Sequence, residues 1–197
     1  MIWGNRNEQE LKRHFEEIAY QYMDILYGTA LKMTKDPVEA EDLVQDTYLR
    51  AYRFFNKFEE GTNFKAWIFK ILTNTFINKY RKKAKQPHQV DFDKVEFLYA
   101  DDQKENSPDN VRNLDNDIYQ KLFDDKINDA LDKLSDEFRM VVLLCDVHGF
   151  AYKEISEIAS IPIGTVMSRL SRGRKQLQGL LLEYAEQEGF IKKRSSN

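Results

Sequence analysis

The sequence predicts an all-α protein with two small helical domains, an N-terminal helical bundle and a C-terminal four-helix domain with a helix-turn-helix, joined by a flexible acidic linker. Apolar residues recur at steps of three and four along most of the chain, which is the spacing of amphipathic helices. The chain has only eight glycines and four prolines in 197 residues, too few for a turn-rich β protein. Its 42% hydrophobic and 13% aromatic residues supply the apolar surface that packed cores require.

The first domain, residues 1–86, is expected to hold three helices. Apolar positions at helical spacing over residues 11–33 predict the first. Asp36 precedes a proline and has a glutamate three residues later, so it is expected to cap a second helix that runs to about residue 55. After a short polar turn, a third helix begins at Phe64 and ends in the basic sequence KYRKKAK.

The linker is expected at residues 87–116, where the helical periodicity is lost. From Asp91 to Asp125 the chain has eleven acidic residues against four basic ones. This composition favours a solvated segment over a packed one.

Helical spacing resumes in the second domain, residues 117–188, which a polar tail at 189–197 follows. Ser135 is expected to cap a helix that ends at His148. A short helix at 152–159, a tight turn and a long last helix then predict a helix-turn-helix.

Charge is distributed in blocks, although the formal net charge is only −3. Residues 79–85 carry five cations and no acid, and residues 163–175 carry four cations and no acid. Residues 36–46 carry five acids and no base. Separate basic blocks are typical of proteins that contact nucleic-acid phosphates. The charge distribution therefore indicates a nucleic-acid partner, although the net charge is negative.

The last helix has the pattern of a DNA-reading helix. One face is apolar and can pack on the preceding helix. The opposite face lacks acids and carries hydroxyl, amide and guanidinium groups, namely Thr165, Ser168, Arg169, Arg172 and Gln176. Such groups can read base edges or bind phosphates in the major groove. A solvated basic face on a packing helix is the alternative interpretation.

The third helix combines aromatic and amide side chains. Trp67 falls on its apolar face and is expected in the core. Asn74 and Asn78 are four residues apart on a face away from Trp67, so they are candidates for contacts with an unpaired base.

The residue pattern predicts no catalytic residue, metal site or cofactor. The acids of residues 36–46 are favoured at a helix start by its dipole, so a solvated face or a docking surface for a basic partner is preferred to a cation site. His14, His88 and His148 are widely spaced and are expected at the surface or its boundary. The single cysteine, Cys145, excludes an intramolecular disulfide and is expected to be buried.

A soluble, cytoplasmic protein without membrane insertion is expected. No run approaches the roughly 18 apolar residues of a membrane span. The N-terminal sequence MIWGNRNEQELKR offers no apolar stretch for an export signal.

More than half of the chain consists of three characteristic stretches: DPVEAEDLVQDTYLRAYRFF, FEEGTNFKAWIFKILTNTFINKYRKK and LSDEFRMVVLLCDVHGFAYKEISEIASIPIGTVMSRLSRGRKQL. Together and in this order, they resemble the extracytoplasmic-function (ECF) sigma factors of the sigma-70 family. The sequences GTNFKAW, ILTNT and PIGTVMSRL further resemble the SigR/SigH branch, whose members commonly respond to thiol or oxidative stress. Met167 stands where the wider family often has arginine.

The resemblance implies roles for three groups of residues. Recognition of the −35 element is implied for Thr165, Ser168, Arg169, Ser171, Arg172 and Gln176. Opening and reading of the −10 element are implied for Glu60, Gly61, Thr62, Asn63, Asn74, Asn78, Arg81 and Lys82. Docking on RNA polymerase is implied for Asp42, Gln45, Asp46, Leu49 and Arg50.

The resemblance also implies the partners: core RNA polymerase, through the clamp helices of its largest subunit and its flap, promoter DNA, and an anti-sigma factor, often one with a zinc site. Catalysis would belong to the polymerase. Two alternatives stay open from the residues alone. A dimeric helix-turn-helix regulator would bind duplex DNA without polymerase, and a helical adaptor that binds only proteins would tolerate the loss of Arg169 and Arg172.

Overall fold

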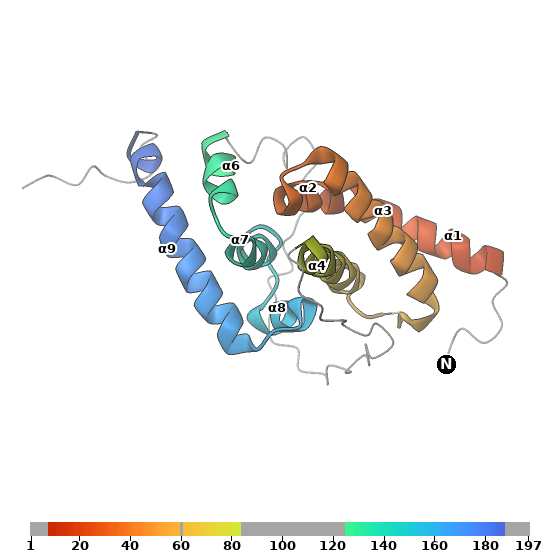
Figure 1. Ribbon diagram of the computed structural model, residues 1–197. Helices are drawn as coiled ribbons and strands as arrows, with labels where there is room; N and C mark the ends of the chain where they lie inside the picture. Colours follow the sequence, from red (N-terminus) through yellow and green to blue (C-terminus); the bar gives the residue numbers. More distant parts are fainter. Residues whose placement is uncertain (1–7, 60, 84–124, 188–197) are drawn as a thin grey trace, which may run out of the picture.

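The computed structural model describes residues 8–59, 61–83 and 125–187, and every regular element in these ranges is helical (Figure 1). The first domain contains α1 (Glu8–Ala19), α2 (Met23–Thr34), α3 (Pro37–Phe54) and α4 (Phe64–Lys83), with 3₁₀ turns at Tyr20–Tyr22 and Phe55–Lys57. The second contains α6 (Asp125–Asp132), α7 (Asp136–Val142), α8 (Tyr152–Ala159) and α9 (Ile163–Gln187), with a π-helical turn at Leu143–Val147. The predicted all-α class with two helical domains is confirmed. The predicted linker and tail lie outside the described residues.

Local signals set the helix starts. Asp36 caps α3 as predicted, because its side chain accepts a hydrogen bond from the Glu39 backbone N–H at 2.9 Å. Ser135 precedes α7 but caps it differently from the prediction. Its backbone carbonyl accepts from the N–H groups of Phe138 and Arg139, and its side chain makes no capping bond.

Two segments predicted as continuous helices are interrupted. Residues 11–33 form α1 and α2, and the 3₁₀ turn between them brings the Tyr22 ring to 5.4 Å from the Phe64 ring. Helix α7 widens into the π-helical turn, after which the His148 N–H bonds the Leu143 carbonyl at 3.0 Å. The chain enters the interior at this point. The expectation of a surface histidine is therefore wrong, because His148 is only 3% exposed.

Helix α4 lies in the middle of the molecule, with α2 and α3 on one side and α8 on the other (Figure 1). Its consecutive residues 67–69 are all buried, as expected of a helix that is surrounded rather than half-exposed. At its start, four aromatic rings form a cluster with neighbouring centroids 5.2 to 6.3 Å apart: Phe55, Phe58, Phe64 and Trp67. The predicted core position of Trp67 is confirmed.

The two domains pack against each other along a seam, which we define as the contact of α2 and α4 with α7, α8 and the π-helical turn. At its centre, Thr29 Oγ1 lies 2.8 Å from His148 Nε2. Because the Thr29 hydroxyl donates to the Ile25 carbonyl at 2.6 Å, its oxygen accepts from the His148 Nε2–H. Lys65 donates to the His148 carbonyl at 2.9 Å, and the Phe69 ring lies 4.6 Å from the imidazole.

A second polar contact ties α7 to the end of α2. The Arg139 side chain is buried, donates to the Met33 carbonyl at 2.9 Å and pairs with Asp136. Lys32 of α2 donates to the Asn128 side chain of α6 at 2.6 Å. A buried guanidinium requires such partners, so this end of the seam is held by specific hydrogen bonds as well as by apolar packing.

The buried His148 predicts a pH dependence. Burial lowers its pKa to about 3, and the Lys65 ammonium acts in the same direction. A solvated histidine has a pKa of about 6.5, so the unfolded chain binds a proton that the packed chain excludes. The resulting stability is fully present above about pH 6.5 and is lost as the pH falls toward 3, by about 1.4 kcal/mol per pH unit.

We therefore expect the urea midpoint of the wild-type chain to fall between about pH 7.5 and about pH 5, and that of His148→Gln to fall less. An identical pH dependence in wild type and His148→Gln would contradict a neutral, buried His148.

Candidate nucleic-acid interface

Helices α8 and α9 form the predicted helix-turn-helix. At the start of α8, the Glu154 carboxylate accepts from the Ala151 N–H at 2.8 Å. The helix ends at Ala159, and the left-handed backbone of Ser160, with φ of 53°, begins the turn. The Ser156 hydroxyl then donates to the Ile161 carbonyl at 2.6 Å. These bonds fix the turn before α9 begins.

Helix α9 is seated closely on α7. Val166 and Leu170 are fully buried. A Cβ on Gly173 would lie 3.1 Å from the Val142 side chain, so glycine allows the two helices to approach. Leu180 lies further along α9 and is 39% exposed, so the packed face ends before it.

The outward side of α9 carries most of the residues predicted to read the −35 element. The exposed ones are Ser168, Ser171, Arg172 and Gln176, and Thr165 is half-buried. Arg169 lies at the margin, because its guanidinium pairs with Glu137 of α7 at 2.9 Å and its side chain is only 20% exposed. The outward side of α9 has no acidic residue of its own, but Glu137 of α7 lies beside it and pairs with Arg169.

Sequence reasoning missed the other edge of α9. Arg174 pairs with Asp146 of the π-helical turn through Nε at 3.1 Å, and it approaches the Tyr152 hydroxyl at 3.4 Å. With Met167 and Lys175 it lines a shallow pocket of about 410 Å³. The cations within residues 169–175 indicated a basic surface on α9. The acids that pair with Arg169 and Arg174 could not be inferred, because they are distant in sequence.

Cys145 is half-buried, so the prediction of a buried thiol is only partly correct. Its sulfur lies 3.3 Å from the Arg174 guanidinium. Burial, followed by the nearby Asp146 carboxylate, raises the pKa of the Cys145 thiol. The raised pKa opposes formation of the reactive thiolate.

Helix α3 presents a row of exposed side chains at steps of three and four, which we call the docking stripe: Val38, Asp42, Gln45, Leu49 and Tyr52. Val38 and Leu49 are 68% and 69% exposed, and with Tyr52 they give the row an apolar character. An exposed apolar row that includes a carboxylate fits a protein partner with cationic groups.

Two further residues predicted to bind polymerase lie beside the stripe. Asp46 forms an ion pair with Lys79 of α4 at 3.0 Å, and Arg50 is half-buried. These side chains also belong to the packing of the first domain. Asp42, Gln45 and Leu49 are therefore the more accessible members of the predicted set.

The loop predicted to read the −10 element is described from Gly61 to Asn63, whereas Glu60 lies outside the described residues. Gly61 has a φ of 90°, which glycine adopts without strain. The Thr62 hydroxyl donates to the Glu59 carbonyl at 2.7 Å. Residues 61–63 thus form a turn that leads into α4.

Asn63 links this loop to both domains. Its Oδ1 accepts from the Ala66 N–H at 3.1 Å, which caps α4, and its Nδ2 donates to Glu154 of α8 at 3.4 Å. Asn74 and Asn78 lie further along α4 and are half-buried. The predicted contacts Arg81 and Lys82 belong to the last turn of α4.

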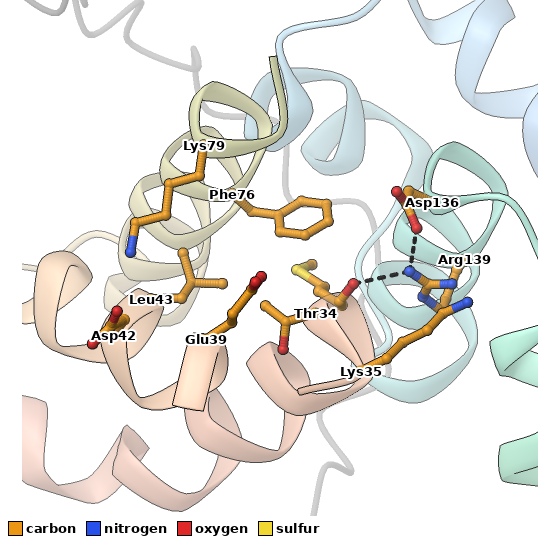
Figure 2. A pocket seen from close by; sticks show the side chains of 10 residues that line it. Thr34, Lys35, Glu39, Asp42, Leu43, Phe76, Lys79, Asp136 and Arg139 are labelled. Carbon is orange, nitrogen blue, oxygen red and sulfur yellow. Dashed lines mark hydrogen bonds and ion pairs between the residues drawn. The ribbon is translucent and has the colours of Figure 1, made fainter. Parts of the chain in front are cut away.

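A pocket of about 590 Å³ lies where α3 meets the seam. Figure 2 shows the side chains that line it. Leu43 and Phe76 line it from the first domain, and Asp136 and Arg139 line it from α7. Asp42 of the docking stripe lies at the same pocket. The stripe and the seam are therefore adjacent.

Within residues 8–59, 61–83 and 125–187, no group of three or more histidine, cysteine or carboxylate side chains could hold a metal ion. Over the same part of the chain, no helix has both the length and the apolar character needed to cross a membrane.

This arrangement defines a two-domain helical protein with a helix-turn-helix and a separate row of exposed side chains on α3, and each domain matches a known family. Residues 19–86 match the family model of sigma-70 region 2, and residues 124–177 match that of sigma-70 region 4. The chain is 30% identical over 189 residues to the ECF RNA polymerase sigma factor SigE of Mycolicibacterium smegmatis, covering 94% of this chain and 68% of that protein. It is 31% identical over 172 residues to the ECF sigma factor SigW of Bacillus subtilis, covering 83% and 87%.

The chain belongs to the ECF sigma factors of the sigma-70 family, as its sequence predicted. Members of this family regulate transcription. The structure resembles that of the sigma factor RpoE in complex with the anti-sigma factor NepR from Bartonella quintana, with a TM-score of 0.62 and 29% identity over 86% of this chain and 98% of that one. It also resembles CnrH in complex with the cytosolic domain of CnrY, with a TM-score of 0.56 over 91% of each chain; at 20% identity this supports the fold alone.

Substitutions at two glycines of α9 test how closely this helix packs against α7. A Cβ at Gly173 would crowd Val142, whereas a Cβ at Gly179 meets nothing within 4 Å. Replacing glycine by alanine inside a helix stabilises it by about 1 kcal/mol, but overpacking costs about 1–3 kcal/mol. We expect Gly173→Ala to be about 1–3 kcal/mol less stable than Gly179→Ala in chemical denaturation. Equal stabilisation by both variants would contradict the close crossing of α7 and α9.

Proposed function

We propose that this sigma factor directs core RNA polymerase to promoters. In this proposal residues 1–86 act as region 2 and residues 117–188 as region 4. The docking stripe binds the polymerase, α9 reads the −35 element, and the Glu60–Asn63 loop with α4 opens and reads the −10 element. The observation that carries the proposal is that one chain exposes both a helix-turn-helix and an apolar, acidic docking stripe. The polymerase supplies the catalysis, in the cytoplasm.

Docking is best tested at the exposed centre of the stripe. Asp42 is a cleaner probe than Asp46, because Asp46 already pairs with Lys79. We expect Asp42→Lys and Leu49→Asp each to weaken binding to core polymerase by at least roughly tenfold, which corresponds to about 1.4 kcal/mol. Fluorescence anisotropy of the labelled chain titrated with polymerase measures the change.

Glu10→Lys is the matched control for docking, because Glu10 is exposed on α1, outside the stripe. It reverses the same charge and should leave the affinity unchanged. Wild-type affinity in Asp42→Lys and Leu49→Asp, with a normal circular-dichroism spectrum, would remove α3 from the polymerase interface.

Reading of the −35 element is supported by the exposed position of Arg172 on α9. An arginine that binds a base contributes about 1–3 kcal/mol, and its loss relaxes preference at one position, whereas loss of a phosphate contact weakens all sequences alike. We expect Arg172→Ala to reduce initiation strongly, and Arg169→Ala to reduce it by at least roughly tenfold. Transcription from a set of single-base −35 variants separates the two kinds of contact.

Arg53→Ala is the control for this test, because Arg53 is exposed on α3, in the other domain. Near-normal transcription from both the Arg172 and the Arg169 variants would show that this side of α9 does not face the promoter.

Opening of the −10 element is supported by Asn74 and Asn78, which share the half-buried side of α4. A pocket that accepts an extruded base offsets part of the few kcal/mol needed to unstack it. We expect Asn74→Ala to slow open-complex formation on duplex DNA, and a pre-melted −10 bubble to restore it. Asn56→Ala, on the exposed 3₁₀ turn, is the control. An equal defect of Asn74→Ala on duplex and bubble would place the residue in docking or folding instead.

Control by an anti-sigma factor is part of the same proposal. It is supported by the similarity at 29% identity to RpoE, whose structure was solved with NepR. A zinc site in the inhibitor and a stress regulon rest on the sequence resemblance to the SigR/SigH branch. Because its raised pKa makes Cys145 a poor redox sensor, the sensor is expected in the inhibitor. Co-purification of a small protein with the tagged chain from its native cells tests this.

A further inference from the structure

Two ion pairs hold α9 at opposite margins of the face that packs on α7. Helical spacing places Arg169 on one side of the buried Leu170 and Arg174 on the other. Arg169 pairs with Glu137 of α7 at 2.9 Å. Arg174 donates to Asp146 of the π-helical turn through Nε at 3.1 Å and through Nη2 at 2.5 Å. Each margin of α9 is therefore held by an acid from outside the helix.

A close approach of the two helices lies between these ion pairs. A Cβ on Gly173 would lie 3.1 Å from the Val142 side chain, and Val142 lies between Glu137 and Asp146 in the sequence. Apolar packing at this point is not directional, so by itself it allows α9 to rotate about its own axis. An ion pair on each side of the point opposes rotation in both directions.

The ion pairs are too exposed to contribute much to stability. The Glu137 side chain is 64% exposed, and the side chains of Arg174 and Asp146 are 45% and 37% exposed. Ion pairs between exposed side chains contribute little to the free energy of unfolding. The apolar contacts of Val166 and Leu170, which are buried, hold the helix on α7. The ion pairs instead fix the direction in which α9 presents its side chains.

The rotation of α9 decides where its outward side chains point. Arg172 lies on that outward side, and no described residue pairs with it. A rotation of about 10° moves a group that lies about 6 Å from the helix axis by about 1 Å. A hydrogen bond to a base edge is lost over such a displacement, because donor and acceptor must lie about 2.7–3.2 Å apart.

We propose that Glu137 and Asp146 are positioning residues for promoter recognition, because they fix the rotation of α9 about its axis. They act through Arg169 and Arg174, and the rotation that they fix points Arg172 toward the bases. The inference deepens the proposed function and rests on it, since it assumes that the outward side of α9 reads the −35 element. The base preference of α9 is thus set in part by two acids that do not themselves bind DNA.

Loss of either carboxylate has two opposite effects on DNA binding. It releases a guanidinium, which can then bind any nearby phosphate, so binding to all sequences becomes stronger. It also allows α9 to rotate, so the preference for the base that Arg172 reads becomes weaker. A substitution that only destabilises the domain weakens both kinds of binding. The combination of stronger general binding and weaker base preference therefore identifies a positioning role.

The test uses holoenzyme assembled from the full chain and core RNA polymerase, on a promoter that the wild-type chain selects from random DNA. Glu137→Gln and Asp146→Asn each remove one charge and keep the shape of the side chain. We expect each to reduce the preference for the selected −35 sequence over its single-base variants roughly fivefold or more. The salt dependence of binding to DNA without a promoter should steepen by about 0.9 in log–log slope, the value for one added phosphate contact. The urea midpoint should stay at the wild-type value.

Glu157→Gln and Asp129→Asn are the matched controls. Both acids are exposed in the second domain, and neither pairs with a described residue of α9. These variants should keep the wild-type base preference and salt dependence. In an Arg169→Ala background, Glu137→Gln should cause no further loss of preference, because its ion pair is already absent.

The Arg172→Ala variant separates this inference from the proposed function. If Arg172→Ala loses the base preference but Glu137→Gln and Asp146→Asn keep it, the positioning role is wrong and the proposed function stands. A further loss of preference when Glu137→Gln is added to Arg169→Ala would also overturn the positioning role, because Glu137 would then act by another route. If wild-type holoenzyme selects no promoter, or if Arg172→Ala keeps the preference, the proposed function itself fails.

Discussion

The buried contact between His148 and Thr29 is the constraint on which the packed arrangement depends. The imidazole sits between domains, where burial holds it neutral and the threonine hydroxyl accepts its Nε2–H. The π-helical turn comes directly before His148 and places its imidazole in the interior. The Lys65 ammonium donates to the His148 carbonyl and holds the backbone there. Helix α4 lies beside this contact and is covered by the first domain on one side and by the second domain on the other.

The proposed functional surfaces differ in whether they contact the seam. The docking stripe of α3 and the outward side of α9 are exposed in the packed arrangement. The −10 loop is not independent of the seam, since Asn63 is bonded to Glu154. The loop before α4 and the helix-turn-helix are therefore in direct contact in this arrangement. Under the proposed function, each basic block supplies only a few phosphate contacts, so polymerase is needed to hold both domains on one promoter.

Much of the fold could be predicted from the sequence, because helix periodicity and caps are local signals. Asp36 marked the start of α3, and the bounds of α8 were read directly from the chain. What could not be predicted depends on residues distant in sequence. Thr29 and His148 are 119 positions apart, and no local pattern reveals that one needs the other. The acids that hold Arg169 and Arg174 come from α7 and the π-helical turn for the same reason. The exposed Val38 and Tyr52 complete a docking stripe whose other members the family resemblance had indicated.

The most direct measurement of the central claim is in vitro transcription with purified core RNA polymerase and a library of random upstream DNA. The chain should produce transcripts from a subset of templates that share two separate sequence elements, one for each domain. Core polymerase alone should not select these templates. Transcription no higher than that of the core enzyme, or enrichment of one element without the other, would contradict an initiation factor that reads promoters with two domains.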